Sequence, residues 1–254
     1  MRRAFAPLAL LSLVLAGWEI ACRALQVPAY FLPAPSDVAA VLAERWPVLL
    51  GSAWTTLSTA LAALVAAALT AGGLALLAGL SDPLERALKP WAVALQVTPV
   101  VAIAPLVVIW AGLDHPERAV IALAAVVAFF PIFSGLLTGL KSADPDLERL
   151  FDLYGASRVQ RLLRLRLPSA VPFLLEGLRV ASGLAVIGAV VAEFVAGSGA
   201  TQGLAWRILE AGNRLRTAEM FAALLVLAVL GFSLNLFVSE LEKRAISRWR
   251  GRAR

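Results

Sequence analysis

The sequence predicts an all-α membrane protein that crosses the bilayer six times. Of its 254 residues, 60% are hydrophobic and 16% are charged, and the mean hydropathy is +0.82. A soluble domain of this length would need far more polar surface. A helix needs about 20 mostly apolar residues to cross a membrane. The chain has such stretches at 5–24, 54–79, 91–112, 118–140, 170–196 and 217–240.

The first apolar stretch follows two arginines and ends at Cys22, an arrangement that also occurs in lipoprotein signal peptides. Glu19 and Ile20 fit such a cleavage site poorly, and the rest of the chain is as apolar as its start. We therefore expect a membrane helix that is retained. It belongs to a predicted N-terminal region, 1–50, that also contains an extracytoplasmic segment.

The segment 25–53 is too polar to cross a membrane. A turn and a helix N-terminus are expected at 33–37, whose sequence is Pro-Ala-Pro-Ser-Asp. Apolar residues then recur at helical spacing, namely Val38, Val41, Leu42 and Trp46. An amphipathic helix on the outer surface and an ordered segment packed on the protein itself both fit this pattern.

Prolines interrupt two of the predicted spans. Pro99 and Pro105 lie in 91–112, and Pro131 lies in 118–140. Proline removes a backbone donor and clashes with the preceding turn, so each should kink its helix or mark a break.

Lysine and arginine are unevenly distributed between the connections. Most of them would share one side of the membrane with the N-terminus, above all in 141–169 and the basic tail 246–254. Such residues are enriched on the cytoplasmic side, so both termini are expected in the cytoplasm. The same bias accounts for the net charge of +6 without a nucleic-acid partner. The outer connections hold Arg23, Arg45, Arg118, Arg207, Arg214 and Arg216.

Catalytic and metal-binding motifs are missing from the sequence. The chain has one cysteine and one histidine, too few for a disulfide or a cysteine-based metal cluster. It has no glycine-rich phosphate loop and no nucleophile elbow. We expect no catalytic residue, no metal and no cofactor in this chain.

The connection 141–169 carries the strongest local pattern. It contains apolar residues at i, i+3, i+4 and i+7, namely Leu147, Leu150, Phe151 and Tyr154, which predict a short amphipathic helix. Gly155 follows, where a helix would end in a left-handed residue. Ser157 and Gln160 form a capping box and predict a second helix. That helix should stop at Leu167, because the residue before a proline disfavours helical geometry.

One side of the second helix is cationic, with Arg158, Arg161 and Arg164 in register. An interfacial helix pair that anchors anionic lipid head groups would show this pattern. A docking element for a cytoplasmic partner would show it as well, and we favour this interpretation.

The loop resembles a cytoplasmic motif of the permease subunits of ABC importers. That motif reads Glu-Ala-Ala, three residues, Gly, nine residues, and Ile-x-Leu-Pro. Gly155, nine residues and Leu165-Arg166-Leu167-Pro168 match its second half, with Leu in place of Ile. The first half departs, because Arg149-Leu150-Phe151 stands in place of Glu-Ala-Ala and Glu148 lies one position earlier.

Further segments are similar to the branch of this family that imports sulfonates, taurine and nitrate. They are Thr98-Pro99-Val100 through Pro105-Leu106, Trp110-Ala111-Gly112-Leu113, Phe130-Pro131-Ile132, Asp144-Pro145 and Val191-Ala192-Glu193. Relatives that import pyrimidine precursors or riboflavin are also similar, at 192–197 and in Trp206-Arg207-Ile208-Leu209-Glu210-Ala211-Gly212. The resemblance covers about 50–245.

The resemblance implies a type I ABC importer permease fold over 51–245. It also implies a homodimer in the inner or plasma membrane, an ATPase dimer that binds ATP and Mg²⁺, and an extracytoplasmic binding protein that delivers a small solute. The residues that would dock the ATPase are Phe151, Asp152, Leu153, Tyr154, Gly155, Ala156, Ser157, Arg158, Arg161, Leu167 and Pro168. Candidates for the pathway or gate are Thr98, Pro99, Ser134, Thr138, Ser182 and Glu193.

Two other classes of function would require different features in the sequence. A secondary, ion-coupled transporter would show inverted repeats and ion-binding carboxylates near the middle of the membrane, and neither is clear here. A membrane enzyme would need a nucleophile, a base or metal ligands. Within the spans, Glu176 and Arg179 lie three residues apart on one helical face, so a local ion pair is expected.

Overall fold

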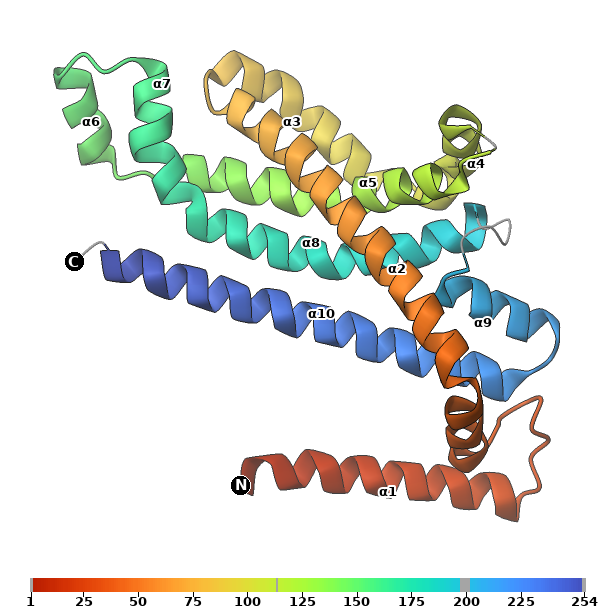
Figure 1. Cartoon of the computed structure of the whole chain (residues 1–254). Coiled ribbons are helices and arrows are strands. Elements are labelled where there is room, and N and C mark those ends of the chain that lie inside the picture. The colour runs from red at the N-terminus through yellow and green to blue at the C-terminus, as the bar shows by residue number, and fades with distance from the viewer. Residues whose placement is uncertain (1, 113, 197–201, 253–254) are drawn as a thin grey trace. The chain divides into compact units, whose positions relative to one another are not determined.

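The computed structural model describes residues 2–112, 114–196 and 202–252, and these residues form helices and connections without a strand. Predictions that involve Leu113, Gly197 or the last two residues of the basic tail lie outside the described residues. The elements in chain order are α1 (Arg2–Ala24), α2 (Pro35–Ala78), α3 (Asp82–Val97), α4 (Val100–Ala111), α5 (Pro116–Leu140), α6 (Pro145–Leu153), α7 (Arg158–Arg161), the π-helical turn η1 (Leu162–Arg166), α8 (Leu167–Ala196), α9 (Leu204–Asn213) and α10 (Thr217–Arg252) (Figure 1).

The predicted all-α membrane fold is confirmed. Among the described residues, four helical stretches are long and apolar enough to cross a bilayer: Pro35–Ala78, Pro116–Leu140, Arg158–Val195 and Thr217–Ser247. The bent pair α3 and α4 adds a fifth if it forms one broken span. The remaining predicted span, 5–24, falls on α1, a helix of 23 residues.

The span predicted at 91–112 is broken in two. α3 and α4 meet at an angle of 103°, and the break lies at Thr98 and Pro99, as expected for one of the three prolines. Thr98 adopts an extended backbone and its hydroxyl donates to the Ala94 carbonyl at 2.7 Å. The residue before a proline avoids helical geometry, so the chain turns there. Pro105 and Pro131 lie inside α4 and α5.

The expected boundary between a surface helix and the second span does not exist. α2 is one helix of 44 residues that begins at Pro35, within the predicted 33–37 turn, and continues through Pro47 and Gly51. A glycine inside a helix costs only about 1 kcal/mol relative to alanine. The two helical patterns on either side of Gly51 therefore join instead of separating.

The chain divides into two compact units, and the first comprises the residues up to Thr55 together with 202–229. Within it, the end of α1 is tied to the start of α2. Glu19 accepts hydrogen bonds from the Ser36 amide and hydroxyl at 2.9 and 2.8 Å, and Arg23 pairs with Asp37 at 2.8 Å. α9 buries Leu204, Ala205, Ile208 and Ala211. The predicted division of the chain at residues 50 and 245 stays a prediction.

The second unit comprises 56–201 and 230–254, and α5 and α8 run alongside each other in it (Figure 1). Glycine allows the close approach, because a Cβ atom at Gly177 would lie 2.6 Å from the Pro131 carbonyl oxygen. On α2, buried alanines recur at helical spacing, namely Ala60, Ala63, Ala67, Ala71 and Ala75. Small residues at such positions let membrane helices pack closely.

The local ion pair expected between Glu176 and Arg179 is not formed. Arg179 instead pairs with Glu242 of α10, with Nε 3.1 Å from Oε2. Arg179 pairs with another helix because α10 brings the half-buried carboxylate of Glu242 within reach. The spacing of residues along one helix cannot predict such a contact.

Adding a methyl group at either of two glycines of α8 should change the unfolding midpoint to different extents, because the two environments differ. We expect Gly177→Ala to lower the unfolding midpoint, because the new Cβ meets a backbone carbonyl and overpacking costs about 1–3 kcal/mol. Gly183→Ala is the matched control, since its nearest neighbour would be the Asn235 side chain at 4.0 Å. Scanning fluorimetry of the purified variants measures both, and equal midpoints would contradict the packing described for α5 and α8.

Candidate functional site

The loop between α5 and α8 is attached to the second unit at its first residue. Lys141 follows α5 directly, and its Nζ lies 2.6 Å from Oε1 of Glu85 on α3. Ser142 then turns the chain by donating its hydroxyl to the Gly139 carbonyl at 2.8 Å. The beginning of the loop is therefore tied both to α3 and to the end of α5.

α6 is the amphipathic helix that the sequence predicts, and it presents its apolar residues to the exterior. It begins after Asp144, whose side chain accepts from the Asp146 amide at 2.8 Å. None of its residues is buried. On its apolar face Leu147 and Leu150 are each 44% exposed, Phe151 is half-buried, and Tyr154, directly after the helix, is 82% exposed. An apolar helix face that the chain itself leaves uncovered indicates an interaction surface.

Gly155 ends α6 in the left-handed region, as predicted, with φ of +63°. The Gly155 amide donates to the Asp152 carbonyl and the Ala156 amide donates to the Phe151 carbonyl, both at 3.0 Å. These two hydrogen bonds form a Schellman motif, which satisfies carbonyls that the helix end leaves free. The two short helices therefore meet at a defined angle.

The capping box is also confirmed. The Gln160 amide donates to the Ser157 hydroxyl at 3.2 Å, and the Ser157 amide donates to the Gln160 side chain at 2.8 Å. It starts α7, which continues directly into the π-helical turn η1.

The predicted stop at Leu167 is wrong, because the chain continues from η1 into α8 with Pro168 in its first turn. In the wider π turn the Leu167 amide donates to Leu162, five residues back. The Ser169 hydroxyl donates to the Leu165 carbonyl at 2.9 Å. Side-chain hydroxyls and local π geometry can satisfy the groups that a proline would otherwise leave free.

Charged side chains hold α6 against the helix that follows it. Glu148 accepts from Arg166 at 2.6 Å and lies 3.4 Å from Arg161. Arg161 also pairs with Asp152. Arg166 reaches back to the Gly79 carbonyl, after the end of α2, at 3.3 Å. We call these four residues, Glu148, Asp152, Arg161 and Arg166, the loop brace.

The loop brace corrects the expected cationic flank. Arg161 is neutralised within the chain, whereas Arg158 and Arg164 remain exposed. Glu148, the displaced acidic residue of the motif, has a structural partner that sequence reasoning missed. Its partner Arg166 lies eighteen residues away, beyond any local spacing rule.

A cleft opens between α6 and α7. It is lined by Leu150, Phe151, Tyr154, Ala156, Gln160 and Arg164. Of the predicted docking residues, Phe151, Tyr154 and Ala156 line this cleft, Asp152 and Arg161 belong to the loop brace, and Arg158 lines a separate cleft beside Gly79. α6 and α7 fold back on each other there (Figure 1). Leu167 and Pro168 lie at the start of α8 and are half-buried. Their part in docking stays a prediction.

The predicted pathway residues belong to the second unit and lie on several of its helices. Ser134 and Thr138 line a cleft between α3 and α5, together with Glu85 and Lys89. Thr98 and Pro99 form the break between α3 and α4.

The other two pathway candidates are buried. Ser182 donates its hydroxyl to the Arg179 carbonyl of its own helix at 2.7 Å. Glu193 has no exposed surface and accepts from the Thr56 hydroxyl at 3.2 Å. The role of all six residues in a pathway stays a prediction.

Comparisons with known proteins agree with the motif of this loop. Residues 69–247 match the family model described as the binding-protein-dependent transport system inner membrane component. A formylaminopyrimidine transport permease of Halalkalibacterium halodurans is 33% identical over 244 residues, which cover 94% of each chain. The taurine transport system permease of Escherichia coli is 32% identical over 245 residues, which cover 92% of this chain and 85% of the relative.

Other relatives are named for aliphatic sulfonates, riboflavin and nitrate. A crystal structure of an amino acid ABC transporter matches the fold with a TM-score of 0.66 at 15% identity, over 82% of this chain and 97% of that one. The resemblance drawn from the motifs is confirmed, and the ion-coupled alternative finds no support. The chain belongs to the binding-protein-dependent transport system inner membrane components and is a membrane permease subunit of an ABC importer.

Proposed function

We propose that two copies of this chain form the transport pathway and that an ATPase dimer docks on their two loops. The ATPase binds ATP and Mg²⁺. The sequence of this chain has no glycine-rich phosphate loop, and its described residues include no cluster of metal-ligating side chains. The permease acts by converting movements of the docked ATPase into movements of its helices.

The observation that carries this proposal is the exposed apolar face of α6. We call its residues Leu147, Leu150, Phe151 and Tyr154 the coupling surface. The loop brace and the two helix caps hold this surface rigidly, and a rigid apolar surface suits docking into a partner's cleft. Of the cationic flank, Arg161 is paired within the chain, which leaves Arg158 and Arg164 exposed to pair with acidic groups of a partner.

Contacts from the loop to the helices offer a route for this movement. Arg166 joins the loop brace to Gly79 after α2, and Lys141 joins the start of the loop to Glu85 on α3. α3 leads to the break at Thr98 and Pro99. A displacement of the docked loop therefore acts directly on the broken helix pair.

The distribution of lysine and arginine supports an orientation in which the loop and both termini face the cytoplasm. An extracytoplasmic binding protein then delivers the solute on the opposite side. Relatives named for taurine and for formylaminopyrimidine support a small organic anion or a pyrimidine or vitamin precursor as the solute.

Reconstitution tests the proposal. The chain is placed in proteoliposomes with and without its ATPase, and uptake from the loaded binding protein is followed. We expect uptake only when the ATPase and ATP are both present. Uptake by the chain alone, driven by a proton or sodium gradient, would overturn it.

A further inference from the structure

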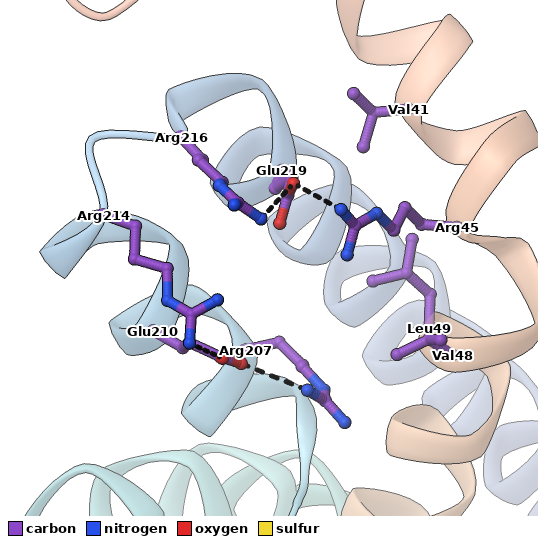
Figure 2. Close-up of a pocket in the computed structure, with 9 residues that line it drawn as sticks. All are labelled: Val41, Arg45, Val48, Leu49, Arg207, Glu210, Arg214, Arg216 and Glu219. Atoms are coloured by element: carbon purple, nitrogen blue, oxygen red, sulfur yellow. Dashed lines mark hydrogen bonds and ion pairs between the residues drawn. The ribbon is translucent and has the colours of Figure 1, made fainter.

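Four of the six arginines assigned to the outer connections gather in one pocket. The pocket lies within the first unit, and its lining residues are Val41, Arg45, Val48, Leu49, Arg207, Glu210, Arg214, Arg216 and Glu219 (Figure 2). The positive-inside rule describes outer segments as poor in arginine. A concentration of arginines in a single outer pocket therefore calls for a function.

Each carboxylate in the pocket is shared between two guanidinium groups. Glu210 contacts Arg207 at 3.1 Å and Arg214 at 3.0 Å. Glu219 contacts Arg45 at 3.2 Å and Arg216 at 3.3 Å (Figure 2). Four arginines face two glutamates, so the lining carries an excess of positive charge. A partly enclosed cavity with such an excess concentrates anions.

The four arginines differ in how firmly the protein holds them. Arg207 also donates to the buried Ser52 at 3.1 Å and to Gln202 at 2.9 Å, so its main role is to join α9 to α2. Arg45, Arg214 and Arg216 each contact one carboxylate, and their side chains are 43%, 57% and 46% exposed. A guanidinium has five N–H donors. These three side chains therefore keep donors for a ligand.

A strained turn places two of these arginines. Leu215 lies between Arg214 and Arg216 with φ of +56°, in a region that glycine usually occupies. Its amide donates to Gly212 at 3.0 Å, and the Arg216 amide donates to Ala211 at 2.9 Å. The turn ends α9 with the same Schellman geometry as Gly155 but with leucine in the unfavourable position. Strain of this kind tends to occur at functional sites.

The opposite wall of the pocket is apolar. Val41, Val48 and Leu49 come from α2, the helix that also supplies Arg45, and the cavity itself measures about 70 Å³. An apolar wall that faces guanidinium groups suits a ligand with an anionic head and a short apolar substituent. Guanidinium groups bind planar or tetrahedral oxyanions through paired, charge-assisted hydrogen bonds.

We propose that this pocket binds a small organic anion, a carboxylate or sulfonate with a short apolar substituent, on the extracytoplasmic side of the permease. The location rests on the orientation given under the proposed function, whereas the binding itself does not. The site supplies guanidinium donors to the head group and the α2 wall to the substituent.

Binding to the full-length chain in lipid nanodiscs tests the proposal without the ATPase or the binding protein. Ethanesulfonate is the anionic probe and ethanesulfonamide its neutral counterpart, and binding is measured by titration calorimetry. We expect saturable binding of ethanesulfonate only. Loss of one charged donor in Arg214→Gln should weaken it by about tenfold.

Arg244→Gln is the matched control, because Arg244 forms the same kind of exposed i, i+4 pair, with Glu240 at 3.0 Å. It should leave the affinity unchanged. Equal binding of both probes, or equal effects of the two substitutions, would overturn the site. An absence of ethanesulfonate binding would also overturn the site, even if Arg214→Gln weakens the complex between the permease and the binding protein. A failure of ATPase docking would leave these results unaffected, so the two proposals are tested separately.

Discussion

Replacing Phe151 and Tyr154 together by aspartate should abolish transport while the permease still inserts and folds. Both residues belong to the coupling surface and neither is buried, since Tyr154 is 82% exposed and Phe151 is half-buried. Aromatic anchors at an interface contribute about 2 kcal/mol each. Losing two should weaken docking of the ATPase by about a thousandfold, and two new carboxylates would be desolvated in any complex that formed.

The measurement is ATPase stimulation by the loaded binding protein in proteoliposomes. Arg149→Ala is the control, because Arg149 lies on the face of α6 opposite the coupling surface and its side chain is 77% exposed. The control should retain stimulation. If the double variant is stimulated normally, the coupling surface does not dock the ATPase.

Gly155→Pro should uncouple the transporter by a different route. The proline nitrogen carries no hydrogen, so the bond from residue 155 to the Asp152 carbonyl is lost. Proline also fixes φ near −65°, whereas the turn requires +63°. Backbone strain of this kind costs about 1–3 kcal/mol, and the chain relieves it by changing the angle between α6 and α7. The coupling surface then no longer fits its partner.

Gly155→Asn separates this geometric effect from a general sensitivity of the position. Asparagine tolerates the left-handed region and keeps the amide donor, so this variant should transport at close to the parental rate. Uptake assays on both variants, at matched amounts of inserted protein, provide the comparison. Equal uptake by the two variants would show that the turn at residue 155 plays no part in coupling.

The sequence predicts features of the loop that depend on local hydrogen bonds. The left-handed Gly155 and the Ser157–Gln160 capping box are both found where local rules place them. Such motifs are defined by residues a few positions apart, so their spacing is visible in the chain itself. The same is true of the break at Pro99, which needs only the proline and the residue before it.

Features that depend on contacts between distant residues could not be predicted. The partnership of Glu148 with Arg166 and the pairing of Arg179 with Glu242 both require the folded arrangement. The rule that the residue before a proline avoids helical geometry predicted too early an end for the second loop helix. The π turn before Pro168 could not be predicted from the sequence. The buried residues of α9 recur at helical spacing, so the sequence contains enough information to predict this helix. The approach of its arginines to Arg45 depends on the folded arrangement and could not be predicted.

Site-directed photo-cross-linking tests the docking of the coupling surface most directly. Benzoylphenylalanine is incorporated in place of Tyr154, which keeps an aromatic side chain at the position, and uptake confirms that the complex still works. We expect an adduct between the permease and the ATPase subunit from position 154, and a much weaker one from position 149, where Arg149 lies on the opposite face of α6. Adducts with lipid alone, in a complex that transports normally, would show that this helix rests on the membrane and does not dock the ATPase.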